Sequence, residues 1–180
     1  MYSNRCLPLT LGTPRNIAEI QRVGESPSGV YVKKILYVDM DNVLVDFKSA
    51  FPRLSAEIKT EYEDRMDDIP GIFALMEPMP GALEAYRELA VHFDTYILST
   101  SPWNNPSASN DKLQWVKKYL GDVAHKRLIL THHKNLNVGQ FLVDDRTNNG
   151  AGRFEGEHLL FGSERFPDWT AVKAYLLQKV

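Results

Sequence analysis

From residue 35 onward, short apolar runs alternate along the chain with longer stretches whose apolar residues recur at helical spacing. Each run is nearly continuous in apolar residues, as expected of strands that are covered on both faces of a sheet. We expect strands at Ile35–Val38, Thr95–Ser99, Arg127–Leu130, Phe141–Val143 and His158–Phe161. Repeated alternation of strand and helix predicts an α/β protein with a mostly parallel sheet and right-handed crossovers.

Three stretches between or after these runs carry apolar stripes at the spacing of an amphipathic helix. Pro80 would open the first helix, Gly121 would follow the end of the second, and Asp168 would cap the start of the third. The residues expected to face the core are Leu83, Tyr86, Leu89 and Ala90, then Leu113, Val116 and Leu120, then Trp169, Val172 and Leu176.

Residues 48–79 interrupt this alternation, because they contain no convincing strand. The segment is first charged, is then broken by Pro and Gly, and is finally apolar. An insertion directly after the first strand lies above the carboxyl edge of the sheet, where open α/β proteins bind ligands. We therefore expect a small helical cap over a ligand site.

The first 33 residues are rich in Pro, Gly, Ser and Asn and have no sustained hydrophobic period. We expect a flexible or loosely docked arm here, followed by one domain at residues 34–180. The arm lacks the continuous apolar centre of a secretory signal. Its first eighteen residues contain Arg5 and Arg15 and no acidic residue, which leaves organellar targeting open.

Composition narrows the classes of partner. The chain of 180 residues has a formal net charge of −2, so it offers no broad basic field for a nucleic acid polymer. Cys6 is its single cysteine, which excludes an intrachain disulfide and fits a reducing, cytoplasmic location. No apolar run approaches the length of a membrane span, so we expect no membrane partner.

Two aspartates follow the first predicted strand. Asp39 would lie at the carboxyl end of that strand, and Asp41 lies two residues further on. Carboxylates this close repel each other, so either one keeps a proton or a cation lies between them. An ionised Asp can act as a nucleophile, and a protonated neighbour can act as a general acid. The alternative is that both residues only cap a helix or close a turn.

A second acidic pair, Asp144 and Asp145, follows the strand at 141–143. Parallel strands end at one edge, so neighbouring strands would bring four carboxylates together, at a cost of several kcal/mol without a cation. Hard oxygen ligands of this kind suit Mg²⁺. The alternative is that Asp144 pairs with Arg146 while Asp145 closes a turn.

Polar residues also follow the two other strands. Thr100 and Ser101 could bind a phosphate oxygen after the strand at 95–99, although turn chemistry is the better explanation for these hydroxyls taken alone. Lys134 could balance the carboxylates and an incoming phosphate, or could be a solvated surface lysine. His132 and His133 are adjacent, so they would point to opposite faces of a strand and are unsuited to joint metal binding.

Asp-x-Asp, Thr/Ser, Lys and Asp-Asp thus follow four successive strand ends. This order resembles the haloacid dehalogenase (HAD) superfamily of phosphohydrolases, with its first, second and fourth motifs in DMDNVLVDF, ILSTSPW and FLVDDR. The stretches EPMPGALEAYREL, STSPW and DKLQWVKKYLG are most similar to 5′(3′)-deoxyribonucleotidases. The resemblance extends from about Ile35 to the C-terminus and implies a Rossmann-like HAD fold with flanking helices.

The resemblance implies a Mg²⁺-dependent phosphomonoesterase. Asp39 would be the nucleophile that forms an aspartyl-phosphate, and Asp41 would protonate the leaving sugar oxygen and later deprotonate the hydrolytic water. Mg²⁺ would be bound by the Asp39 side chain, the Asp41 backbone carbonyl and Asp145, with Asp144 bound directly or through water. The residues implied to hold the phosphoryl group are Thr100, Ser101, Lys134 and Asn42.

The chain departs from the deoxyribonucleotidases at two places. Asn42 stands where the family usually has Gly, and Asn tolerates a left-handed backbone. The segment from Phe47 to Pro80 is shorter than in the animal enzymes and has no clear match for their base-contacting aromatic pair. Phe47 and Phe73 are candidates for stacking on a base, although core or cap packing is the better explanation for Phe73. Lys112 lies where the family has a further basic residue near the substrate.

The favoured substrate is a deoxyribonucleoside monophosphate. The alternatives are another small phosphomonoester, such as a sugar phosphate, and a binding module for phosphate or metal without catalysis. Homodimer formation is left open.

Overall fold

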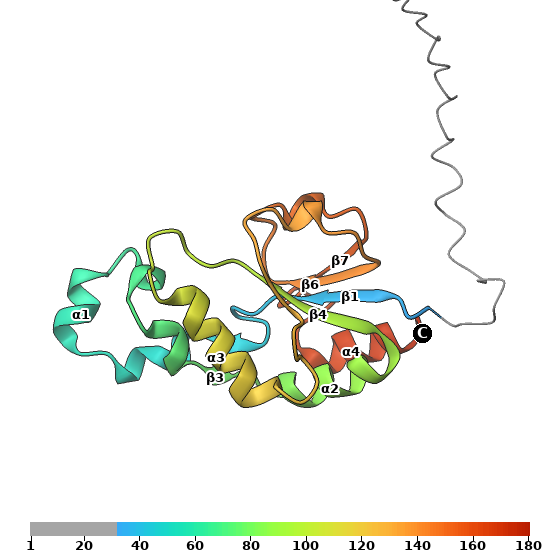
Figure 1. Ribbon diagram of the computed structural model, residues 1–180, viewed down its shortest axis with the longest axis horizontal. Helices are drawn as coiled ribbons and strands as arrows, with labels where there is room; N and C mark the ends of the chain where they lie inside the picture. Colours follow the sequence, from blue (N-terminus) through green and yellow to red (C-terminus); the bar gives the residue numbers. More distant parts are fainter. Residues whose placement is uncertain (1–31) are drawn as a thin grey trace, which may run out of the picture. The chain divides into compact units, whose positions relative to one another are not determined.

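The computed structural model describes residues 32–180, of which residues 33–180 form one compact unit. All but the last two residues of the expected arm, including Arg5, Cys6 and Arg15, lie outside the described residues. The centre of the unit is a five-stranded sheet in the order β5-β4-β1-β6-β7 (Figure 1). Its strands are β1 Ile35–Val38, β4 Asp94–Ser99, β5 Leu128–Leu130, β6 Phe141–Asp144 and β7 Glu157–Leu160. All neighbours are parallel, which confirms the predicted α/β fold.

The two faces of the sheet are covered unequally. Three helices, α2 Ala82–His92, α3 Ala108–Leu120 and α4 Trp169–Leu177, pack on the side of Leu36 and Val38 and enclose the larger core. Successive side chains of a strand point to opposite faces. Tyr37 therefore faces a smaller cluster, which Phe154 closes at the end of the loop after β6. Figure 1 shows the helices below the sheet and this loop above it.

The helix ends follow simple local chemistry, with two differences from the sequence-based expectation. Asp168 caps α4 as predicted, since its side chain accepts a hydrogen bond of 3.0 Å from the backbone N–H of Ala171. Helix α2 begins after Gly81, whose φ is +75°, and Pro80 therefore lies outside the helix. Gly121 has a φ of −60°, so it makes no use of the left-handed region. A Cβ there would lie 2.5 Å from the carbonyl oxygen of Lys117, which explains the need for Gly.

The buried face of α3 differs from the predicted stripe. Val116 and Leu120 are buried as expected, but Leu113 is 38% exposed. Two charged residues, Asp111 and Lys112, occupy buried positions on this helix instead. The hydrophobic period fails here because this face meets polar groups at the end of the sheet as well as apolar side chains.

A two-stranded antiparallel ribbon connects the insertion to the sheet. Strand β2 Val45–Asp46 pairs with β3 Glu77–Pro78, a strand too short to give a sequence signal. The cap segment, which we define as residues 47–76, runs from one to the other. It contains η2 Phe47–Arg53, α1 Ala56–Glu61, η3 Met66–Asp68 and η4 Ile72–Leu75.

The parts of the cap segment differ in how firmly they are attached. The buried Asn105 side chain donates hydrogen bonds of 2.8 Å to the carbonyls of Asp67 and Ile69. Trp115 of α3 donates one of 2.9 Å to the carbonyl of Met76. In contrast, α1 has no buried residue. The second half of the cap segment is therefore fixed to α3, and α1 is the loosely attached part.

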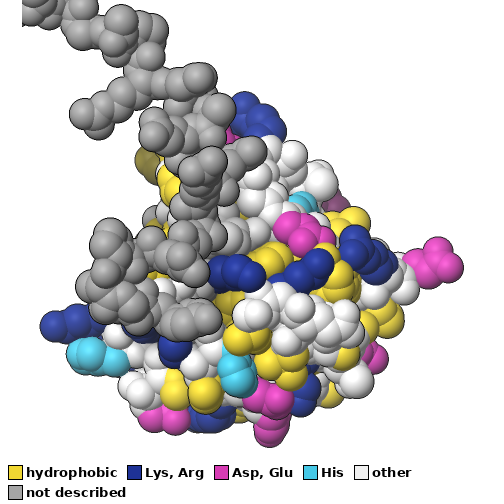
Figure 2. Space-filling model, turned by 90° about the vertical axis from the view of Figure 1, so that its right-hand side faces the viewer, with side chains coloured by type: hydrophobic (Ala, Val, Ile, Leu, Met, Phe, Trp, Pro, Cys, Tyr) yellow, Lys and Arg dark blue, Asp and Glu magenta, His cyan; other side chains and the backbone are white. Residues whose placement is uncertain are grey.

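The surface carries charges of both signs. On the face at the amino ends of the strands, basic and acidic side chains are interspersed (Figure 2). Among residues 32–180, we find no helix with the length and apolar character that a membrane span requires.

Candidate active site

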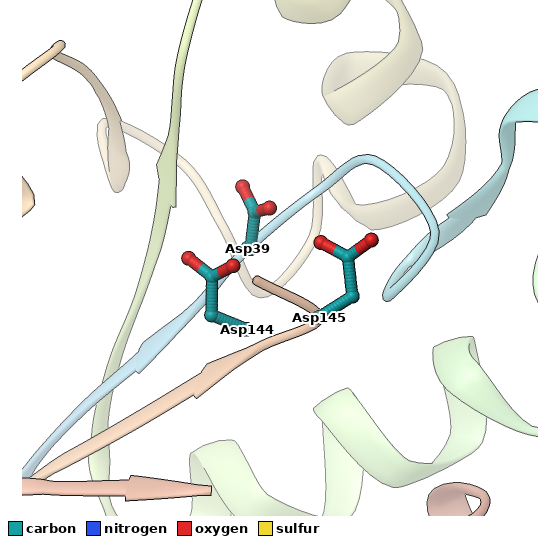
Figure 3. Close-up of side chains that lie close together, drawn as sticks. All are labelled: Asp39, Asp144 and Asp145. Carbon is teal, nitrogen blue, oxygen red and sulfur yellow. The ribbon is translucent and has the colours of Figure 1, made fainter. Parts of the chain in front are cut away.

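The register of the sheet brings the predicted carboxylates together. Val38 pairs with Ile97 of β4 on one side and with Val143 of β6 on the other. Asp39 and Asp144 each follow these paired residues, and the backbone N–H of Asp39 donates a hydrogen bond of 2.8 Å to the carbonyl of Val143. Both side chains therefore leave neighbouring strands at the same edge, as the sequence predicted (Figure 3).

Three carboxylates could share one ion. Asp39, Asp144 and Asp145 each offer an oxygen atom, and these atoms lie within 4.8 Å of one another. Burial, followed by the charge of Asp39, raises the pKa of Asp144 to about 6. Burial also raises the pKa of Asp145 above its ordinary value. Ionising all three carboxylates is therefore unfavourable without a cation, and a bound cation would relieve the repulsion.

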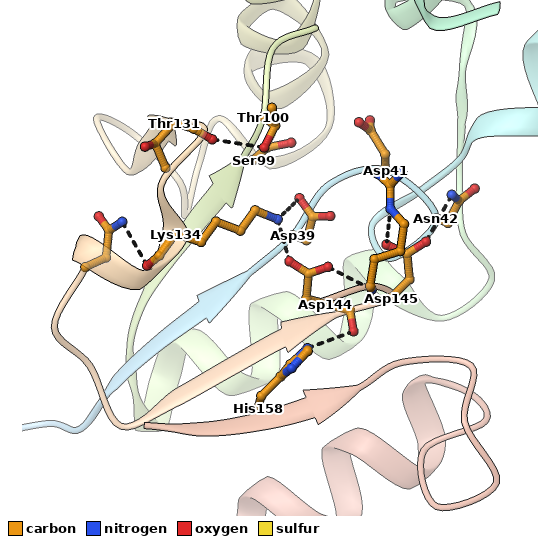
Figure 4. A network of polar contacts seen from close by, with 12 residues as sticks. Asp39, Asp41, Asn42, Ser99, Thr100, Thr131, Lys134, Asp144, Asp145 and His158 are labelled. Atoms are coloured by element: carbon orange, nitrogen blue, oxygen red, sulfur yellow. Dashed lines mark hydrogen bonds and ion pairs between the residues drawn. The ribbon is translucent and has the colours of Figure 1, made fainter. Parts of the chain in front are cut away.

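Lys134 lies between two of these carboxylates. Its Nζ is 2.8 Å from Asp39 Oδ1 and 2.5 Å from Asp144 Oδ2, and its side chain is 4% exposed (Figure 4). Burial would lower the pKa of Lys134, but the charges of Asp39 and Asp144 outweigh it and raise this pKa. An ammonium group has three donors, so one donor remains for a further oxygen.

Asp41 lies on the other side of the cluster, in the loop that leads to the cap segment. Its Oδ2 accepts a hydrogen bond of 2.6 Å from Lys112 Nζ. Its Oδ1 is buried and has no hydrogen-bond partner. Burial raises the pKa of Asp41, and the charge of Lys112 opposes this effect without cancelling it. A raised pKa favours the protonated acid.

Asn42 shapes this loop. Its φ of +56° lies in the left-handed region, as the substitution of Asn for Gly predicted. Its side-chain amide donates a hydrogen bond of 3.2 Å to Asp145 Oδ2. Asn42 therefore orients one carboxylate of the cluster. Its side chain lines the wider groove described below and not the small pocket above the carboxylates.

Thr100 and Ser101 differ in position. Thr100 lines the small pocket above the carboxylates, and its Oγ1 donates a hydrogen bond of 2.9 Å to the carbonyl of Thr131. The Ser101 hydroxyl instead lies 2.8 Å from the hydroxyl of Ser109 on α3. Its side chain is therefore engaged away from the pocket.

A wide groove of about 830 Å³ opens from this pocket beneath the cap segment. Phe47, Phe51 and Met66 supply apolar surface, and acidic residues of the cap segment line the same groove. Trp103, which is 88% exposed, and His132 stand at the opposite wall with their ring centroids 6.0 Å apart. The site thus combines a small charged end with a large, partly aromatic space.

Comparison with known proteins identifies the family. A family model for "5' nucleotidase, deoxy (Pyrimidine), cytosolic type C protein" matches residues 65–170. A protein of Vibrio phage KVP40 named "Putative 5'(3')-deoxyribonucleotidase" is 59% identical over 144 residues, which is 80% of this chain and 85% of the relative. The chain belongs to this deoxyribonucleotidase family.

More distant relatives support the same family assignment. The human protein named 5'(3')-deoxyribonucleotidase, cytosolic type, is 32% identical over 75% of this chain and 76% of its own length. The fold is that of the HAD hydrolases. A structure titled "putative HAD-hydrolase YfnB from Bacillus subtilis bound to magnesium" superposes with a TM-score of 0.56 at 11% identity, over 81% of this chain and 99% of that chain. This member of the deoxyribonucleotidase family is accordingly a phosphomonoester hydrolase of the HAD superfamily.

Two residues that the resemblance placed near a substrate have other surroundings in this deoxyribonucleotidase-family protein. Phe73 is fully buried and packs against Phe47 with a centroid distance of 6.0 Å, so it belongs to the core beneath the groove. Lys112 is also fully buried and contacts Asp41. Phe47 does line the groove, as expected of a base-contacting residue.

Sequence reasoning did not assign three residues to the pocket, Arg146, Asn148 and Asn149. It names Arg146 only as an alternative ion-pair partner of Asp144. Arg146 directly follows the acidic pair, and its Nε lies 3.4 Å from Asp145 Oδ1. Asn149 has a φ of +50°, and its carbonyl accepts a hydrogen bond of 2.8 Å from the Lys134 backbone. The polar run RTNN after Asp145 was the available signal.

Proposed function

We propose that this protein is a Mg²⁺-dependent phosphatase of deoxyribonucleoside monophosphates that works through an aspartyl-phosphate on Asp39. The observation that carries the proposal is the joint position of Asp39 and Asp145, whose oxygens are close enough to share one ion. The family membership and the aromatic wall of the adjoining groove support a nucleotide as the substrate.

The residues present fit a magnesium ion. Asp145 Oδ1 is buried without a hydrogen-bond partner, and the donor set consists of hard carboxylate oxygens. Asp39 and Asp145, with the backbone carbonyl of Asp41, would hold the ion. Asp144 has both oxygens engaged, one with Lys134 and one with the Arg146 backbone N–H at 3.0 Å, so it fits a supporting position. When bound, Mg²⁺ would neutralise charge on the phosphoryl oxygens.

The chain's own residues would perform the transfer in two steps. An Asp39 oxygen attacks phosphorus, the bond from phosphorus to the sugar oxygen breaks, and Asp41 gives its proton to that oxygen. Asp41 then takes a proton from a water molecule that attacks the aspartyl-phosphate, which releases inorganic phosphate and restores Asp39. Lys134 and Thr100 line the pocket where the phosphoryl oxygens would lie, so they are placed to stabilise negative charge.

A phosphate-release assay tests the proposal directly. The purified chain would be given dUMP, dTMP, other deoxyribonucleoside monophosphates and a set of sugar phosphates, each with Mg²⁺ and with EDTA. We expect turnover of the nucleotides that depends on Mg²⁺. Turnover of a sugar phosphate without turnover of any nucleotide would replace the proposed substrate class, and no turnover of any phosphomonoester would contradict the proposal as a whole.

A further inference from the structure

A fully buried lysine lies next to the proposed acid. Lys112 on α3 has no exposed surface. Its Nζ donates hydrogen bonds of 2.6 Å to Asp41 Oδ2 and 3.0 Å to the Ser99 hydroxyl, and it lies 4.5 Å from the centroid of the Phe73 ring. Burial of a lysine is expensive unless its partners are well placed. Here all three neighbours suit a cation, because they are a carboxylate, a hydroxyl oxygen and an aromatic face.

Lys112 is buried behind Asp41, away from the cavities of the site. Lys112 lines neither the small pocket nor the groove, whereas Asp41 lines both. Asp41 therefore separates the ammonium group from the space where substrate would bind. The lysine engages one oxygen of Asp41, and the other oxygen, Oδ1, is left without a hydrogen-bond partner.

Lys112 is itself fixed from three elements. It projects from α3, Ser99 ends β4, and Phe73 belongs to η4 of the cap segment. Strand β4 and η4 both pack into the buried core. The ammonium group is consequently a fixed point, and the carboxylate of Asp41 takes its orientation from it.

We propose that Lys112 is a positioning residue that holds Asp41 in the orientation needed to protonate the leaving sugar oxygen. The proposal rests on the proposed function, because it concerns the step in which the phosphorus–oxygen bond to the sugar breaks and the Asp41 proton moves to that oxygen. Lys112 neither gains nor loses a proton in this step. Its effect acts through Asp41 alone.

The test compares two substrates whose leaving groups differ in their need for a proton. The first is dTMP, whose alkoxide is a poor leaving group, and the second is 4-nitrophenyl phosphate, whose phenolate leaves without protonation. We expect Lys112→Met to lower kcat/KM for dTMP by about 100-fold, the size of loss caused by a misplaced catalytic group. For 4-nitrophenyl phosphate, kcat/KM covers only the steps through formation of the aspartyl-phosphate, so it should fall by less than about threefold.

A double-mutant cycle supplies the second measurement. If Lys112 acts only through Asp41, the variant with both Lys112→Met and Asp41→Asn should lose no more activity on dTMP than Asp41→Asn alone. Lys117→Met serves as the matched control, because Lys117 lies on the same helix and is exposed. Lys112→Gln replaces Lys112→Met if the latter does not fold, and circular dichroism reports on folding.

Three results would overturn the inference: equal loss on both substrates, no loss on either, or additive losses in the cycle. Equal loss would assign Lys112 a purely structural role. These outcomes are separate from a failure of the proposed function, which the wild-type protein reveals by itself. If the wild type ignores dTMP but hydrolyses another alkyl phosphate, that ester takes the place of dTMP in the same comparison.

Discussion

The charged pocket and the groove beneath the cap segment are built in different ways. In the pocket, Lys134 contacts Asp39 and Asp144, and both aspartates leave neighbouring strands of the sheet. In the groove, Phe51 and Met66 project from short 3₁₀ elements, and neighbouring α1 has no buried residue. The groups proposed to perform the chemistry thus stand at the edge of the sheet, and the groups proposed to meet the variable part of a substrate stand on the cap segment.

This contrast predicts that changes in the pocket affect the rate of the chemical step, while changes in the groove affect mainly the apparent affinity for substrate. The pocket also carries the larger stored repulsion, because burial and neighbouring charge raise the pKa of Asp144. Its variants should therefore show the larger effects on both activity and stability.

The largest effect is expected for the replacement of the proposed nucleophile. Asp39→Asn should lower phosphate release from dTMP below about one ten-thousandth of the wild-type rate, because a carboxamide cannot form the aspartyl-phosphate. The fold should remain, since Asn keeps the size of Asp. Phosphate release measures the loss, and exposed Asp122→Asn is the control. Retention of most of the activity in Asp39→Asn would contradict the assignment.

The second effect concerns the lysine between the carboxylates. Lys134→Met should lower the free energy of unfolding by about 3–5 kcal/mol, since it leaves buried charges without their partner. Addition of Mg²⁺ should restore part of this loss, because the ion would supply the missing positive charge. Urea unfolding with and without Mg²⁺ measures both quantities. If Mg²⁺ stabilised the wild type and the variant equally, Lys134 would not act at the ion site.

A smaller effect is expected in the groove. Phe51→Ala should raise KM for dTMP by about tenfold with little change in kcat, because loss of one aromatic surface weakens base stacking by about 1–3 kcal/mol. Glycerol 2-phosphate, which has no base, is the control substrate and should show no change in KM. Equal KM values for dTMP in wild type and variant would remove Phe51 from the base site.

The sequence was sufficient for the five strands of the parallel sheet and for the convergence of Asp39 and Asp144, because continuous apolar runs mark buried parallel strands and register follows from the sheet. The sequence was insufficient for the buried face of α3, because the buried Lys112 breaks the hydrophobic period. It also could not place Ser101, because the direction of a side chain after a strand depends on a neighbour, here Ser109. Arg146 was missed since a loop has no period that marks the residues facing a pocket.

The smallest effect concerns the attachment of the cap segment and has a defined pH dependence. Arg53 forms an ion pair with Glu77 of β3. The hydrogen bond from the Arg53 side chain, followed by its charge, lowers the pKa of Glu77 from its ordinary value of 4.5. A carboxylate whose pKa is lower in the folded state contributes stability above its unfolded pKa, and this contribution disappears as the pH falls through the folded pKa. Both side chains are about half exposed, so solvent screens the pair and the effect is small.

Arg53→Met should therefore raise the pKa of Glu77 toward 4.5. It should also reduce the free energy of unfolding at pH 7, and this reduction should shrink as the pH falls through the folded pKa of Glu77. Carbon NMR titration of the Glu77 carboxyl gives the pKa, and urea unfolding at a series of pH values gives the stability. Glu57 is the internal control, because its pKa is lowered by hydrogen bonds to its own backbone and to Ser55 and should not respond to Arg53→Met. An unchanged titration of Glu77 in the variant would show that Arg53 does not hold β3 to η2 in solution. The hydrogen bond of 2.8 Å from the Glu77 backbone N–H to the Ser49 hydroxyl would then be the link between these two elements.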